Sequence, residues 1–128
     1  MKKNIKKNII LILKAISKIN EDLLNKSNEY FGIWKEENGQ KIFALFIEDF
    51  DPLEIGNDYF GLIHAPSSYE FENKIYKTNY RLVYVCRSWS GIRVKELNVE
   101  DLLDVEKRYL EDLAITLFKI VWSINSKM

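Results

Sequence analysis

Apolar residues recur every three or four positions at the start of the chain, which places one apolar stripe along an α-helix. The stripe consists of Ile5, Ile9, Ile12, Ile16, Ile19 and Leu23. We expect this helix over about residues 4–26, with Asn4 as a candidate N-cap and the polar residues 25–28 as its end. The opposite face carries Lys6, Lys7, Lys14 and Lys18. We expect the stripe to pack on a sheet, although a basic amphipathic helix can also lie on an anionic membrane.

A β-hairpin is predicted next, because Asn38-Gly39 separates two runs that are rich in β-forming residues, 30–37 and 40–48. Asn-Gly is typical of a type I′ turn, in which both central residues need a positive φ. The stretch Ile42–Ile47 is apolar at every position, so it predicts a central strand that is buried on both faces.

The middle of the chain predicts a loop and further strands. Residues 49–58 contain Pro52 and Gly56, which are typical of a loop. Residues 59–64 predict a short strand, 65–68 a turn, and 69–76 a half-exposed strand in which aromatic and polar residues alternate. Residues 81–87 and 92–97 flank Ser88-Trp89-Ser90-Gly91 and predict a second hairpin.

The last predicted element is one long helix from about Val99 to Ile124, after an N-cap at Asn98. Its inward seam is expected at Leu103, Leu110, Leu117 and Ile124, which lie seven residues apart. Together these elements predict an α+β fold. We expect a two-layer sandwich, in which the N- and C-terminal helices pack on one face of a mostly antiparallel sheet of about five strands.

Composition is that of one globular domain, which we expect to span residues 1–128. A hydrophobic content of 47% is ample for a core, and 30% charged residues keep such a domain in solution. The lone Cys86 excludes an internal disulfide and is expected to be a small core residue. No signal-peptide cleavage site follows the short apolar run Ile9–Leu13. We therefore expect a cytoplasmic protein with no membrane partner.

Charge is sorted along the chain although the formal net charge is zero. Residues 42–73 contain seven acids and no base, whereas residues 74–95 contain six bases and no acid. Segregated charge determines which macromolecules a surface attracts, so it bears on partners more than on fold. Ile, Lys and Asn, whose codons are rich in A and T, make up 42 of the 128 residues, which fits a bacterial accessory gene.

No pattern for catalysis, a metal or a cofactor is present, and we expect a protein that is not an enzyme. One His and one Cys do not make a zinc site, and the carboxylates of residues 49–54 lack the spacing of a calcium loop. His64 is expected to be a partly exposed structural histidine, because no serine elbow accompanies it. Glycine-rich phosphate motifs are absent as well.

Acids among aromatic residues predict a protein-binding surface with apolar anchors and a charged rim. The candidate partner-binding residues are Glu48, Asp49, Phe50, Asp51, Glu54, Asp58, Phe60, Glu70 and Glu72. A basic partner would be steered to such a surface. Our first hypothesis is therefore an immunity (antitoxin-like) protein that binds and neutralises a basic bacterial toxin such as a nuclease.

Two other functions stay open. Residues 74–95 interleave bases with Tyr76, Tyr80, Tyr84 and Trp89, a composition that single-stranded nucleic-acid binders use. A secretion chaperone is the other alternative, since such proteins are small and often dimeric. The apolar second half of the final helix could form a homodimer interface.

Overall fold

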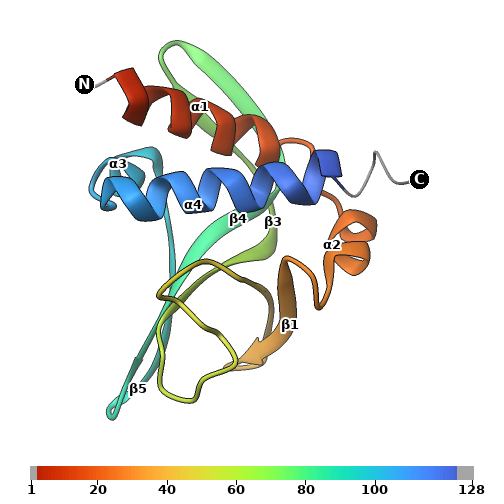
Figure 1. Ribbon diagram of the computed structural model, residues 1–128, viewed down its shortest axis with the longest axis vertical. Helices are drawn as coiled ribbons and strands as arrows, with labels where there is room; N and C mark the ends of the chain where they lie inside the picture. Colours follow the sequence, from red (N-terminus) through yellow and green to blue (C-terminus); the bar gives the residue numbers. More distant parts are fainter. Residues whose placement is uncertain (1–2, 124–128) are drawn as a thin grey trace.

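The computed structural model describes residues 3–123 of the chain and contains one antiparallel sheet with strands in the order β1-β2-β3-β4-β5 (Figure 1). The strands are β1 (Gly32–Glu37), β2 (Gln40–Leu45), β3 (Tyr59–Phe71), β4 (Lys74–Ser88) and β5 (Gly91–Glu96). Strands that follow one another in the sequence also neighbour one another in the sheet. The prediction of an α+β fold with about five antiparallel strands is confirmed.

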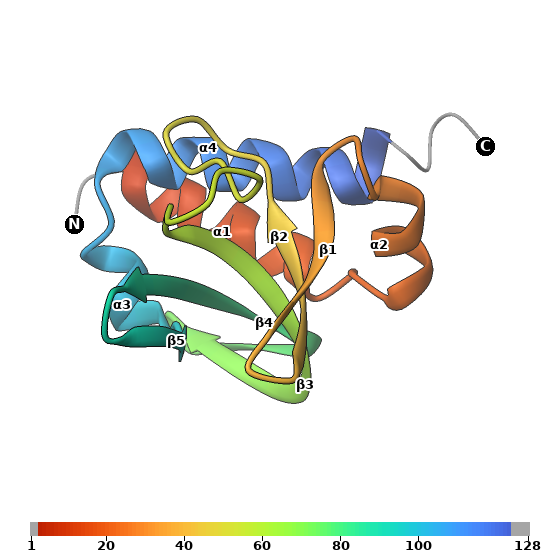
Figure 2. The ribbon, with the colours of Figure 1, turned by 90° about the horizontal axis from the view of Figure 1, so that it is seen from below.

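The helices α1 (Lys3–Ile16) and α4 (Lys107–Phe118) lie side by side and form one layer on the sheet (Figures 1 and 2). Both contribute fully buried residues to a core that they share with one face of the strands. Ile12 of α1, Leu113 of α4 and Leu82 of β4 all have no exposed surface. The two ends of the chain therefore complete the same core, as the two-layer prediction requires.

The single N-terminal helix is a wrong prediction, because α1 ends at Ile16 and a separate helix α2 (Glu21–Ser27) follows. Asn20 is the reason: its side chain accepts a hydrogen bond of 2.8 Å from the backbone N–H of Leu23 and so caps α2. Asn4 is not a cap, since α1 already begins at Lys3.

The C-terminal helix is also broken. It comprises α3 (Val99–Leu103), α4 and a final π-helical turn η1 (Lys119–Ser123), with residues 104–106 outside the helices. Asn98 does precede α3, and its backbone N–H donates to the Asp101 carboxylate over 2.8 Å. The break shifts the helical phase: Leu102 is buried, whereas Leu103 of the predicted seam is 38% exposed. Leu110 and Leu117 are fully buried as predicted, and Ile124 lies outside the described residues.

The hairpin predictions are confirmed at residues 38–39 and 88–91, where β1 pairs with β2 and β4 with β5. Asn38 and Gly39 both have a positive φ, as a type I′ turn needs. The predicted turn at residues 65–68 is wrong, because β3 continues through it with a register irregularity between His64 and Ser67. A bulge tolerates Pro66, which has no N–H to donate to the ladder. The turn lies instead at Glu72 and Asn73, which also have positive φ.

The prediction of a central second strand is confirmed, since β2 lies between β1 and β3 and its residues 42–45 are fully buried. The face of the sheet away from the helices carries a second, smaller core that includes Ile42, Tyr59 and Val83. The first hairpin turn is joined to β5 there by a 2.9 Å hydrogen bond from Asn38 Nδ2 to the Ile92 carbonyl. Within residues 3–123, no helix has the length and apolar character that a membrane span needs.

Candidate protein-binding surface

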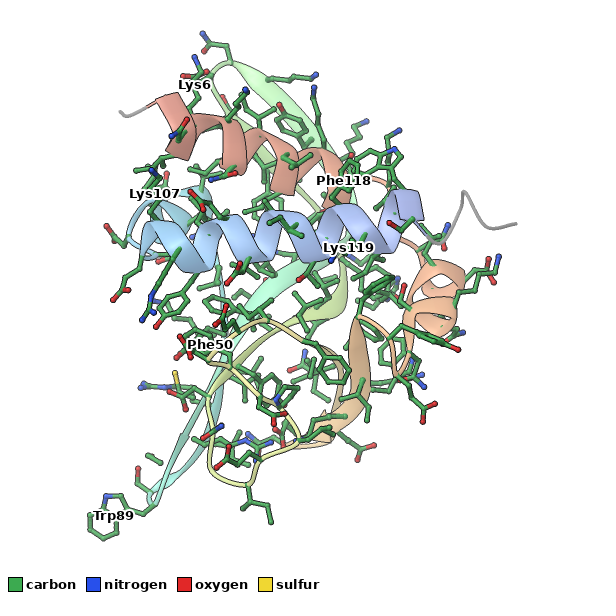
Figure 3. All side chains as sticks on the ribbon, viewed as in Figure 1. Lys6, Phe50, Trp89, Lys107, Phe118 and Lys119 are labelled. Carbon is green, nitrogen blue, oxygen red and sulfur yellow. The ribbon has the colours of Figure 1, made fainter. Side chains whose placement is uncertain are left out.

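The loop between β2 and β3, residues 46–58, lies beside α4 and is anchored by Phe50 (Figure 3). The ring of Phe50 packs edge-on against three others, with centroid distances of 5.1 Å to Phe60, 6.1 Å to Tyr84 and 4.7 Å to Tyr109. Ile47 and Phe50 also form an isolated antiparallel bridge. Phe50 thus ties the start of the loop to the sheet and to α4.

The rest of the loop is braced by polar contacts. Lys35 Nζ donates to the Pro52 carbonyl, and Asp49 forms an ion pair of 3.3 Å with Arg108 of α4. Asp51 accepts a 2.9 Å hydrogen bond from the Leu53 backbone N–H, as an Asx turn does. Burial lowers the pKa of Lys35, and the positive charge of Arg87 lowers it further. These contacts connect the loop to β1 and α4 and stabilise its turn.

The braced loop presents apolar side chains to solvent. Ile55 is 96% exposed and Leu53 is 61% exposed. The same loop carries four exposed carboxylates, Glu48, Asp49, Asp51 and Glu54, of which Asp49 is paired with Arg108. We call these six residues the acidic loop surface. A hollow of about 450 Å³ lies beside it, lined by residues that include Phe46, Pro52 and Leu53.

Two of the predicted partner-binding residues, Asp58 and Phe60, make contacts within the fold instead. Asp58 is half-buried and accepts hydrogen bonds from the Arg87 backbone N–H, at 2.7 Å, and from the Tyr84 hydroxyl, at 3.2 Å. Burial, followed by the charge of Asp58, raises the pKa of Tyr84 to about 12. Phe60 is only 4% exposed and belongs to the main core. Phe50 is half-buried, so a partner could reach only part of its ring.

Glu70 and Glu72 do not lie with the other candidates. They stand at the far end of β3, roughly 30 Å from Phe60 for an extended strand of ten residues. Glu72 forms a 2.9 Å ion pair with Lys6 of α1. The nine predicted residues therefore divide into four exposed loop acids, two half-buried loop residues (Phe50 and Asp58), one core residue and a distant pair.

A buried charged group on the second face was not predicted from the sequence. Glu37 accepts from the Tyr59 hydroxyl at 2.5 Å and from Arg87 at 2.6 Å. Burial and the hydrogen bond to Glu37 raise the pKa of Tyr59 above its usual value. Glu37, Tyr59 and Arg87 lie far apart in the sequence, so nothing in it indicates their contact until the strands are placed together.

The basic segment of residues 74–95 uses much of its charge inside the fold. Arg87 pairs with Glu37, Arg81 with Glu96 at 3.1 Å, and Lys95 with Asp101 at 3.5 Å. Tyr76 and Tyr80 are buried in the main core. Trp89 is fully exposed at the tip of the β4–β5 hairpin and points away from the molecule (Figure 3). Few of the predicted bases and rings are therefore presented together to a nucleic acid.

The structure also places His64 and Cys86, the only histidine and the only cysteine of the chain. His64 is exposed on β3, and its ring lies 5.4 Å from that of Tyr80. Cys86 is half-buried on β4 rather than in the core.

The outer face of α4 carries exposed apolar residues near its C-terminal end. Ile115 is 49% exposed and Phe118 is 43% exposed, and the Phe118 ring lies 4.7 Å from that of Trp122. A homodimer through the C-terminal helix would use this face, and it stays a prediction.

No family model matches this chain, and no curated protein or solved structure matches it either.

Proposed function

We propose that this chain is a non-enzymatic binding protein of the immunity (antitoxin-like) class, which occludes a basic bacterial toxin such as a nuclease. The observation that carries the proposal is the acidic loop surface, where Leu53 and Ile55 are exposed among four exposed carboxylates. Exposed apolar anchors give a complex its affinity, and surrounding charge of one sign selects a partner of the other sign.

The bracing of the loop supports this proposal. Binding is weakened by the entropy lost when flexible groups become ordered, and a loop that is already fixed loses less. Lys35, Arg108 and the rings around Phe50 provide that fixation here. A rigid acidic surface can therefore bind a basic partner tightly and at a high association rate.

A secretion chaperone is a second candidate, and the exposed apolar face of α4 favours it. Ile115 and Phe118 would be buried if two copies paired through this face. The nucleic-acid alternative has less support, because three of its six bases are paired with acids of the same chain.

The proposal is tested with the variant Glu48→Lys/Glu54→Lys/Ile55→Ser. Purified wild-type and variant proteins are used to capture partners from the source cells, and the captured protein is expressed alone. We expect the wild type to capture a basic protein that stops growth, and the variant to lose that capture and its protection of growing cells. Asp58 is left unchanged because it supports the backbone of Arg87.

The matched control is Glu36→Lys/Glu100→Lys, which reverses two exposed acids elsewhere. It should capture the partner and protect the cells as the wild type does. Equal loss in the control would mean that only net charge matters, and a captured protein that is acidic or harmless would overturn the proposal.

A further inference from the structure

An aromatic cleft lies beside the acidic loop surface, at the break between α3 and α4. Its volume is about 300 Å³. The three break residues, Asp104, Val105 and Glu106, line it together with Phe50 of the loop. The cleft therefore lies where the helix is interrupted.

Aromatic rings make up much of the cleft. Phe50, Phe60, Tyr84 and Tyr109 all line it; Phe60 is buried and the other three are half-buried. They meet edge to face, at centroid distances between 4.7 and 6.1 Å. Tyr109 already carries one guanidinium, since Arg108 lies 4.4 Å from the centre of its ring.

The charged residues of the cleft are mainly acids. Asp101, Asp104 and Glu106 line it, against the lining base Lys95 and against Arg108, which pairs with Glu106 over 3.3 Å, so the local charge is −3 + 2 = −1. Asp104 and Glu106 are exposed, so an entering cation can reach both carboxylates, and at Glu106 it would share the carboxylate with Arg108. Lys95 is engaged with Asp101 over 3.5 Å.

We infer that this aromatic cleft receives an arginine side chain of a basic protein partner, an inference that rests on the function proposed above. A volume of about 300 Å³ is at the low end for ligand pockets and suits one side chain better than a larger molecule. A guanidinium stacks on aromatic faces and binds carboxylates through paired N–H groups. Lysine lacks the planar group for such stacking, and a phosphate or nucleotide would be repelled by the net negative lining.

The test uses the whole ¹⁵N-labelled protein and three short peptides of Gly and Ser with a central arginine, lysine or citrulline. Amide shifts are followed at low salt, with peptide at millimolar concentration. We expect the arginine peptide to shift the amides of Leu97, Val105 and Tyr109 in a saturable way, and the neutral citrulline peptide to leave them unchanged. Asp104→Asn/Glu106→Gln should weaken arginine binding roughly threefold to tenfold.

Two further variants make the outcome specific. Glu100→Gln/Glu111→Gln removes two exposed acids from the same two helices and should leave the affinity as it is. Lys95→Gln removes the base of the cleft and should strengthen binding. The inference would be overturned if both acid-pair variants lost affinity for the arginine peptide equally, or if no amide shift were saturable. It would also be overturned if the lysine peptide bound more tightly than the arginine peptide, or if the citrulline peptide bound equally well.

These results are distinguishable from a failure of the proposed function. If the arginine peptide binds in the cleft but no toxic partner is captured, the toxin proposal fails while the cleft assignment stands. If capture depends on Ile55 but no peptide binds, the cleft assignment alone fails.

Discussion

Glu37 is a buried carboxylate that joins the first hairpin to the far end of β4. It meets Arg87 at 2.6 Å, and the side chains of Glu37 and Arg87 are only 8% and 14% exposed. Two such charges are stable in the interior only while both are present, since the loss of one leaves the other desolvated and unpaired. Tyr59 completes the group through its hydroxyl.

Glu37→Gln should therefore lower the free energy of unfolding by about 3 kcal/mol, because Arg87 keeps its charge in a buried site. Urea unfolding followed by circular dichroism measures this change. Glu36→Gln is the matched control, since Glu36 is the exposed neighbour on the same strand, and its effect should stay within about 0.5 kcal/mol. Equal effects at the two positions would show that the buried pair adds nothing to stability.

The helices at the C-terminal end show how one break changes the role of a whole segment. Leu110 and Leu117 of α4 face the core, whereas Leu103, seven residues before Leu110, is 38% exposed because α3 ends there. Residues 104–106 lie outside the helices and line the aromatic cleft. A local change in backbone direction thus produces both the phase shift and the candidate arginine site.

Leu110→Ala should destabilise the protein by about 2–5 kcal/mol, because it leaves a cavity in a fully buried part of the core. Leu103→Ala removes the same atoms from an exposed position and should cost less than about 1 kcal/mol. Thermal or urea unfolding of both variants checks the difference. Similar losses would mean that the two leucines are equally buried in solution and that α3 and α4 form one helix.

The molecule as a whole depends on both ends of the chain. α1 and α4 pack together on the same sheet face and share one core (Figure 2). Each helix buries its inward apolar stripe partly against the other, so neither end should be stable without the other. This arrangement favours one cooperative unit, which is the single domain that the composition predicts.

We expect unfolding in urea to be a single transition, with tryptophan fluorescence and far-ultraviolet circular dichroism giving the same midpoint. Trp34 packs on the main core and should report its loss, while circular dichroism reports all the helices. Deletion of residues 1–19 should abolish the transition altogether. Two separated midpoints, or a folded deletion variant, would contradict the prediction of one domain.

The sequence by itself predicted the features that depend on neighbouring residues. Asn38-Gly39 needs only its own backbone preference to form the first turn, and the apolar run of β2 needs only its composition to indicate a central strand. The stripes of α1 and α4 likewise follow from residue spacing and show which sides face the core. The fold class follows from these elements, because they must bury their apolar faces against one another.

Tertiary structure alone decided what depends on residues that are far apart in the chain. The acids of residues 42–73 are continuous in sequence, yet β3 extends and separates Glu70 and Glu72 from the loop. Arg87 belongs to a basic segment in the sequence, but Glu37, 50 residues away, neutralises it inside the fold. Local spacing carries no information about such partners. The rings of the aromatic cleft also come from four separate segments, and only the packed chain brings them together.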